Sequence, residues 1–133
     1  MQKTMPVFFL TLMTLFTACG QSSTSAGGVK SMTGAELQQL KLTADWQVLD
    51  VRTAEEVAEG VIPGATHFAD FYAADFSAQI ERLDRSKKWV VYCRSGKRSS
   101  QAAEQMVKMG FTQVYNLQGG ISSWTGPLKH AKP

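Results

Sequence analysis

The chain has 133 residues, 44% of them hydrophobic and 19% charged, which is ordinary for a soluble globular protein. That length allows one domain with a hydrophobic core of its own. The formal net charge of +3 is too small to indicate a nucleic-acid partner.

The N-terminal segment has the pattern of a secretory signal. A short positive start, Met1-Gln2-Lys3, precedes an apolar stretch over residues 7–16. This stretch is shorter than the roughly 20 apolar residues that a permanent membrane helix needs. We therefore expect residues 1–18 to be a signal peptide.

Residues Phe16-Thr17-Ala18-Cys19 resemble the lipobox of bacterial lipoproteins, although leucine is more usual at the first position. In such proteins the signal is cut before the cysteine, whose thiol carries diacylglycerol. The resemblance implies lipidation at Cys19 and a lipid anchor on the periplasmic side of a bacterial membrane, in the cell envelope. The alternative is an ordinary signal peptide and a soluble periplasmic or secreted protein.

A Ser-, Gly- and Thr-rich segment follows, and we expect residues 19–28 to be a lipidated flexible tether. The folded domain is predicted over residues 29–128, with a polar tail at 129–133. If Cys19 carries lipid, Cys93 is the only free thiol; a Cys19–Cys93 disulfide is the alternative.

The first half of the domain alternates helix and strand signals. Thr33 to Glu36 and Thr53 to Glu56 both have capping-box spacing, which predicts one short helix after residue 33 and another ending near Gly60. The apolar run 46–51 predicts a buried strand between them. A Pro-Gly turn over 62–65 and a very short strand at 67–68 follow.

The second half continues the alternation. Apolar spacing predicts a helix over 73–83, a strand over 88–92 and a helix over 99–109 that Gly110 ends. A strand over 111–117, a Gly-Gly turn and a short helix over 121–124 complete the chain. This order predicts an α/β fold with a central, mostly parallel sheet and helices on both faces.

The segment Cys93-Arg94-Ser95-Gly96-Lys97-Arg98-Ser99 carries the chemistry. It places a thiol at a strand end, before a glycine, three cations and a helix N-terminus. Free backbone N–H groups at a helix start bind anions, and nearby cations lower the pKa of a thiol. Cys93 is therefore the candidate nucleophile, and the six residues after it are the candidate substrate-binding loop.

This loop resembles the active-site loop of rhodanese-like sulfurtransferases. Two further stretches agree with that family: Leu49-Asp50-Val51-Arg52 with Glu56 and residues 60–65, and Asn116 to Ile121 with Trp124. The three occur in the family's order and cover nearly all of residues 30–125. The chain also resembles single-domain periplasmic thiosulfate sulfurtransferases of this family. Val57 and Val61 stand where the family usually has an aromatic residue and a histidine.

The resemblance implies a rhodanese-like domain and a sulfane sulfur carried on Cys93. Four residues separate Cys93 from Arg98. Related cysteine phosphatases need five, because their loop encloses a tetrahedral phosphoryl group. The shorter loop favours a single sulfur atom and makes a phosphatase or arsenate reductase the less favoured reading.

The implied reaction moves sulfur from a small anionic donor such as thiosulfate to a thiophilic acceptor, cyanide or a thiol. Arg94 and Lys97 would recruit the donor, and Arg98 would contribute to the positive field of the loop. No metal or organic cofactor is required. The alternative is a persulfide carrier or binding module that turns over little by itself and passes sulfur to a protein acceptor.

Asp50, Arg52 and Glu56 could be mistaken for an acid–base group. Their spacing and the family resemblance instead predict a salt-bridged support beneath the sheet edge.

Overall fold

The computed structural model describes residues 27–131. The predicted signal peptide 1–18, Cys19 and most of the tether lie outside these residues. Ten elements follow one another along the described chain: β1 Lys30–Met32, α1 Gly34–Gln39, β2 Trp46–Asp50, α2 Ala54–Ala58, β3 Ala65–Phe68, α3 Phe76–Glu81, β4 Lys88–Tyr92, α4 Lys97–Lys108, β5 Val114–Leu117 and the 3₁₀ helix η1 Gly120–Ser123.

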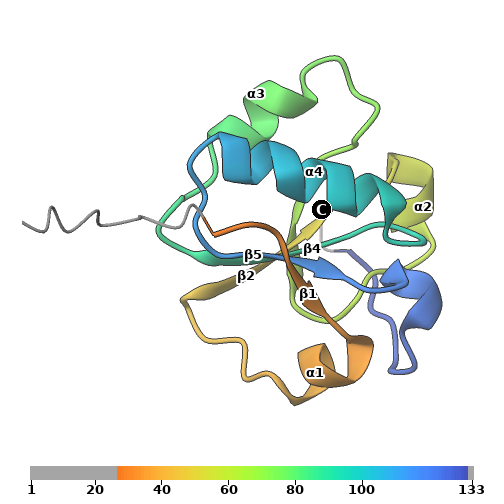
Figure 1. The fold of residues 1–133 in the computed structure, drawn as a ribbon. Helices are drawn as coiled ribbons and strands as arrows, with labels where there is room; N and C mark the ends of the chain where they lie inside the picture. The colour runs from red at the N-terminus through yellow and green to blue at the C-terminus, as the bar shows by residue number, and fades with distance from the viewer. Residues whose placement is uncertain (1–26, 132–133) are drawn as a thin grey trace, which may run out of the picture.

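The five strands form one sheet in the order β1-β5-β4-β2-β3, and every pair is parallel. Figure 1 shows α3 and α4 together on one face of this sheet and α1 on the other. The predicted α/β fold, with a parallel central sheet covered on both faces, is confirmed.

Strand alternation divides the core into two layers. Leu49, Trp89 and Val91 face α3 and α4, where they join Ile80 and Met106. On the opposite face the core contains the alternate strand positions, the first helix and the C-terminal segment: Val48, Val90, Tyr92, Leu117, Leu37 and Trp124. The central strands are buried on both faces, which is why they read as continuous apolar runs.

Both predicted capping boxes form. Glu36 N donates to Thr33 Oγ1 at 3.2 Å, and Thr33 N donates to Glu36 Oε2 at 2.7 Å. The Thr53–Glu56 pair repeats this exchange at 3.4 and 3.1 Å. Each box satisfies two N–H groups that a helix start leaves without partners.

Several boundaries differ from the sequence predictions; β3, for example, begins at Ala65 instead of residue 67. α4 begins at Lys97 instead of residue 99, with Gly96 as its N-cap. The predicted helix 73–83 is shorter, spanning Phe76–Glu81, because residues 73–75 form a turn in which Ala73 N bonds to Asp70 O.

The predicted strand 111–117 is likewise shorter, because Phe111 belongs to the end of the preceding helix. Phe111 N donates to Met106 O at 3.1 Å and Gly110 N to Val107 O at 3.0 Å. Gly110 takes a φ of +97°, and these two bonds with that conformation form a Schellman cap. Strand pairing begins only at Val114.

β1 was not predicted from the sequence. Only Met32 of its three residues is buried, so it lacks an apolar pattern. Its strand conformation comes from parallel pairing with β5.

The sheet order determines where a ligand would bind. The chain leaves β2 towards β3 and leaves β4 towards β5, in opposite directions across the sheet. In open α/β sheets, ligands bind outside the carboxyl ends of the strands at such a reversal. Cys93 directly follows β4 at this position.

Candidate active site

Cys93 is a free thiol with 1% of its surface exposed. Three donors from the following loop and helix point at its sulfur. Gly96 N lies 3.1 Å from Sγ, and Ser99 N and Ser99 Oγ each lie 3.4 Å from it. We call this set of donors the thiol cradle. Such a set stabilises an anion at the sulfur position.

The pKa of the Cys93 thiol reflects two opposing influences. Burial is the largest and raises the pKa. Hydrogen bonds from the Ser99 hydroxyl and from the N–H groups of Ser99, Gly96 and Ser95 together outweigh it, so the pKa lies below its ordinary value. The thiolate is favoured by hydrogen bonds more than by the cations that the sequence analysis emphasised.

The loop that carries the cradle is held from outside by the N-terminus of η1. Ile121 N donates to Cys93 O at 2.9 Å, and Ser122 N donates to Arg94 O at 3.0 Å. Because a peptide group is planar and trans, these bonds fix the next N–H groups, of Arg94 and Ser95, on the opposite side. The two bonds therefore help to direct loop donors inward.

Gly120 allows this close approach. It has a φ of +57°, and a Cβ at this position would collide with Cys93 O and lie 2.6 Å from Arg94 O. The sequence predicts the Gly-Gly turn but not the contacts that residues 121 and 122 make with the loop. Every residue except proline has a backbone N–H, so side-chain identity could not reveal these contacts.

The three predicted loop cations occupy different surroundings. Arg94 and Lys97 are exposed. Arg98 forms a two-pronged ion pair with Glu56, Nη1 to Oε2 and Nη2 to Oε1, both at 2.8 Å. Its guanidinium also lies 5.5 Å from the centre of the Tyr72 ring. Arg98 thus joins α4 to α2, and its charge remains beside the loop.

The ion pair affects both partners. The hydrogen bonds from Arg98 are the largest influence on Glu56 and lower the pKa of its carboxyl to about 2. The same hydrogen bonds raise the pKa of Arg98. Both groups are therefore charged throughout the neutral range.

Asp50 and Arg52 form the support predicted beneath the site. Arg52 Nη2 lies 2.7 Å from Asp50 Oδ2, and both side chains are buried. Arg52 also donates to the carbonyl oxygens of Glu56 at 3.0 Å and Gly60 at 2.8 Å. Glu56 contributes only this main-chain oxygen, since its carboxylate pairs with Arg98. The three residues predicted as one group therefore belong to two separate ion pairs, Asp50–Arg52 and Glu56–Arg98.

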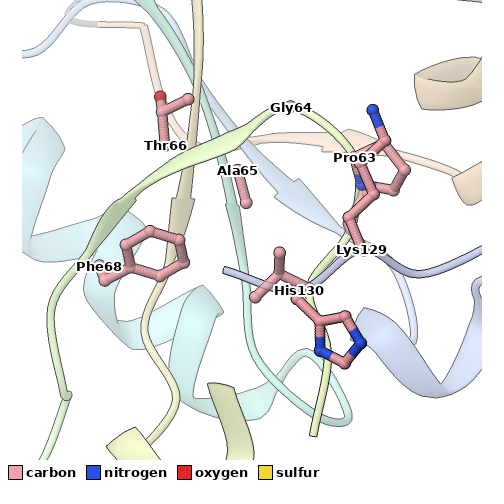
Figure 2. A pocket seen from close by; sticks show the side chains of 9 residues that line it. Pro63, Gly64, Ala65, Thr66, Phe68, Lys129 and His130 are labelled. Atoms are coloured by element: carbon pink, nitrogen blue, oxygen red, sulfur yellow. The ribbon is translucent and has the colours of Figure 1, made fainter. Parts of the chain in front are cut away.

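A hollow of about 360 Å³ lies apart from the Cys93 loop, along β3 and the C-terminal residues Lys129 and His130. Figure 2 shows Ala65, Thr66 and Phe68 on its strand side. Lys129, the first residue of the predicted polar tail, pairs with Val61 through two backbone hydrogen bonds. The hollow contains no residue of the candidate site.

Between residues 27 and 131, no group of three or more His, Cys, Asp or Glu side chains is placed to hold a metal ion. In the same part of the chain, every helix is too short or too polar to cross a membrane.

A family model described as a rhodanese-like domain matches residues 33–127. The chain belongs to the rhodanese-like family. The match includes the whole Cys93 loop, both ion pairs and η1.

Similar proteins agree with this assignment. YtwF of Bacillus subtilis is 39% identical over 103 residues, which cover 76% of this chain and 95% of YtwF. The thiosulfate sulfurtransferase GlpE of Pseudomonas entomophila is 38% identical over 88 residues, covering 65% of this chain and 78% of GlpE. The crystal structure of a rhodanese-related protein from Thermoplasma volcanium superposes with a TM-score of 0.65 at 29% identity, covering 75% of this chain and 97% of the other. The rhodanese-like chain thus has relatives that are named as sulfurtransferases.

Proposed function

We propose that this rhodanese-like protein is a sulfurtransferase that carries a sulfane sulfur on Cys93, taking it from a small anionic donor such as thiosulfate. The observation that supports this most directly is the thiol cradle. Gly96 N, Ser99 N and Ser99 Oγ converge on a single sulfur atom that is buried at the bottom of a loop with exposed cations.

In the first half of the reaction, the Cys93 thiolate attacks the outer sulfur of thiosulfate. A new S–S bond forms to Cys93, and the bond to the sulfite group breaks, so that sulfite leaves with the bonding electron pair. The product is a Cys93 persulfide anion. Backbone N–H groups of the loop are suited to stabilise its charge.

In the second half, a thiophilic acceptor such as cyanide or a thiolate attacks the outer sulfur of the persulfide. The bond between the two sulfur atoms breaks, and Cys93 leaves as a thiolate. The donors that lower the pKa of Cys93 also make it a better leaving group. The same cradle therefore assists both halves of a double displacement.

The loop length supports sulfur as the group transferred. Arg98 follows Cys93 after four residues, and the sixth position after the cysteine is Ser99. Ser99 belongs to the cradle through its backbone N–H and its hydroxyl. A phosphatase or arsenate reductase is the less favoured reading.

The test treats the purified protein with thiosulfate and measures its mass, then measures turnover from thiosulfate to cyanide. We expect a gain of one sulfur atom on Cys93 and steady turnover, both abolished in Cys93→Ser. Loading without turnover would indicate the carrier instead. Absence of added sulfur would contradict both, and hydrolysis of an aryl phosphate or reduction of arsenate would then favour the third reading.

We also propose that the protein acts in the cell envelope, anchored by a lipid on Cys19. The support is the lipobox-like sequence at residues 16–19. The full-length chain should fractionate with membranes and incorporate labelled fatty acid, and Cys19→Ser should abolish this incorporation. A wild-type chain found in the soluble periplasmic fraction would contradict the anchor but leave the sulfur chemistry untouched.

A further inference from the structure

Asn116 occupies a position beside the thiol cradle to which the sequence analysis gave no role. It lies on β5 opposite Val91 of β4, two residues before Cys93 in the neighbouring strand. Its side chain is half-buried at the carboxyl end of the sheet, where the loop begins.

The Asn116 side chain makes two hydrogen bonds, both to residues of the cradle. Its Nδ2 donates to Gly96 O at 3.3 Å, and its Oδ1 accepts from the Ser99 hydroxyl at 2.7 Å. Gly96 O can only accept, so the amide nitrogen must face it and the amide oxygen must face Ser99. One side chain thus bridges the loop and the first turn of α4.

The first of these bonds holds a peptide group. Gly96 O also accepts the first hydrogen bond of α4, from Ser100 N at 3.0 Å, so Asn116 adds a second donor to this carbonyl and ties Gly96 to β5. Ile121 and Ser122 hold the carbonyls of Cys93 and Arg94 in the same manner. Ile121 and Ser122 make these contacts with backbone atoms, whereas Asn116 makes its contact with a side chain. Substitution of Asn116 can therefore remove its contact without altering the backbone of the loop.

The second bond holds the Ser99 side chain. The hydroxyl has one hydrogen and two neighbours that can accept it, Asn116 Oδ1 at 2.7 Å and Cys93 Sγ at 3.4 Å. The shorter contact to Asn116 keeps Ser99 Oγ beside the sulfur, and rotation about the Cβ–Oγ bond of Ser99 can direct its hydrogen to either acceptor.

We propose that Asn116 is a positioning residue for Cys93: it holds the Ser99 hydroxyl beside the sulfur and, through the Gly96 carbonyl, helps to hold Gly96, whose own N–H donates to Sγ. The inference deepens the proposed function, because it concerns the thiol that would carry the sulfur. Asn116 does not touch Cys93 itself; it acts through Ser99 and Gly96.

The main variant is Asn116→Leu, which keeps the size of the side chain and removes both hydrogen bonds. The measurement is the rate of Cys93 alkylation by iodoacetamide as a function of pH, which reports the thiolate fraction without any sulfur donor. We expect the Cys93 pKa to rise by about 0.5–1 unit, which slows alkylation about three- to tenfold at pH values below it. At high pH the rates of variant and wild type should converge.

Tyr115→Leu is the matched control. Tyr115 neighbours Asn116 on β5 but packs with Trp46 on the opposite face of the sheet. It should lower the melting temperature without moving the pKa of Cys93. Asn116→Ser, too short to reach both partners, provides a second variant if the leucine prevents folding, and it should shift the pKa in the same direction.

The charged groups around the thiol are Arg94, Lys97 and Arg98 of its own loop and Glu56 of α2. No Asn116 variant alters any of them. In a Ser99→Ala background, the pKa shift of Cys93 caused by Asn116→Leu should be smaller, because the contact between Asn116 and the Ser99 hydroxyl is already absent and only the contact to Gly96 remains. An equal shift in both backgrounds would show that Asn116 does not act through Ser99.

An unchanged alkylation profile in a folded Asn116 variant would overturn the inference, whether or not its melting temperature falls. Failure of the proposed function would look different. The wild-type protein would gain no sulfur from thiosulfate, while the alkylation profiles of wild type and variants would still differ.

Discussion

Arg94 and Lys97 lie exposed around a buried thiol, and neither forms a salt bridge with a described residue. The hydrogen bonds from Ser99 and the loop N–H groups, in contrast, reach the sulfur directly. At the scale of single residues, the loop cations and the hydrogen-bond donors therefore have different roles. The donors favour the thiolate, and under the proposed function the exposed cations would attract the anionic sulfur donor.

Arg94→Gln tests this difference in roles. We expect the KM for thiosulfate to rise about 1.4- to fivefold, since an exposed charge pair contributes about 0.2–1 kcal/mol. The difference should shrink at high salt, because exposed charges are screened. Alkylation by iodoacetamide, which is neutral, should stay at the wild-type rate.

Lys108→Gln removes a charge from the other end of α4 and is the matched control for Arg94→Gln. It should leave the KM for thiosulfate unchanged. Slower alkylation in Arg94→Gln would show that Arg94 also supports the thiolate, contrary to this difference in roles.

At the scale of elements, η1 is a structural part of the active-site loop although the two are more than twenty residues apart. Its first N–H groups bind the carbonyls of Cys93 and Arg94, and Gly120 brings the two backbones together. Any side chain at position 120 must push η1 away from the loop.

Gly120→Ala should therefore reduce both stability and thiol reactivity. Gly110→Ala is its control, because Gly110 also has a left-handed conformation, with a φ of +97° compared with +57° for Gly120. At Gly110, however, an added Cβ would meet only Arg85 side-chain atoms, at 3.9 Å or more. The control should lose only about 1–2 kcal/mol of unfolding free energy through backbone strain. Urea unfolding and alkylation rates together separate the two effects. Normal alkylation in a folded Gly120→Ala protein would contradict this role of η1.

Much of this element structure could be predicted from the sequence, because its causes are local. The capping boxes at Thr33 and Thr53, the buried runs of β2 and β4 and the glycine stop after α4 each depend on neighbouring residues. β1 could not be predicted, because its conformation depends on pairing with β5, more than eighty residues away.

The candidate site divides in the same way. Cys93 and its loop follow from one segment of sequence, whereas the partner of Arg98 lies 42 residues earlier, in α2. From the sequence, Arg98 is expected to contribute to the positive field of the loop and Glu56 to lie with Arg52. Only the folded arrangement shows that Arg98 and Glu56 pair with each other. The hydrogen bonds from Ile121 N and Ser122 N to the loop are made by backbone atoms. The identities of their side chains therefore do not predict these bonds.

At the scale of the whole molecule, the ion pair between Glu56 and Arg98 joins a helix from the first half of the chain to one from the second. The folded protein lowers the pKa of Glu56 from 4.5 to about 2. A group with a lowered pKa contributes stability above its unfolded pKa and loses it as the pH falls through the folded value. The contribution of Glu56 should therefore be complete near pH 7 and decline from about pH 5 to about pH 2.

Glu56→Gln keeps an oxygen for the capping box and removes the charge. We expect it to reduce the unfolding free energy by about 1 kcal/mol near neutral pH, since the pair is only partly buried. Urea unfolding at a series of pH values should show the two proteins converging in acid. Glu55→Gln, on the exposed side of α2, should show no such convergence. A wild-type advantage that persists at pH 2 would contradict the assignment.

The residues that hold the Cys93 loop in place come later in the chain than the loop itself. Cys93 leaves the ribosome before Asn116, Ile121 and Ser122, which hold its loop in place. Until those residues arrive, the thiol has its own loop but none of the contacts that orient it. The loop around Cys93 therefore gains these contacts only when the last elements of the domain fold onto it.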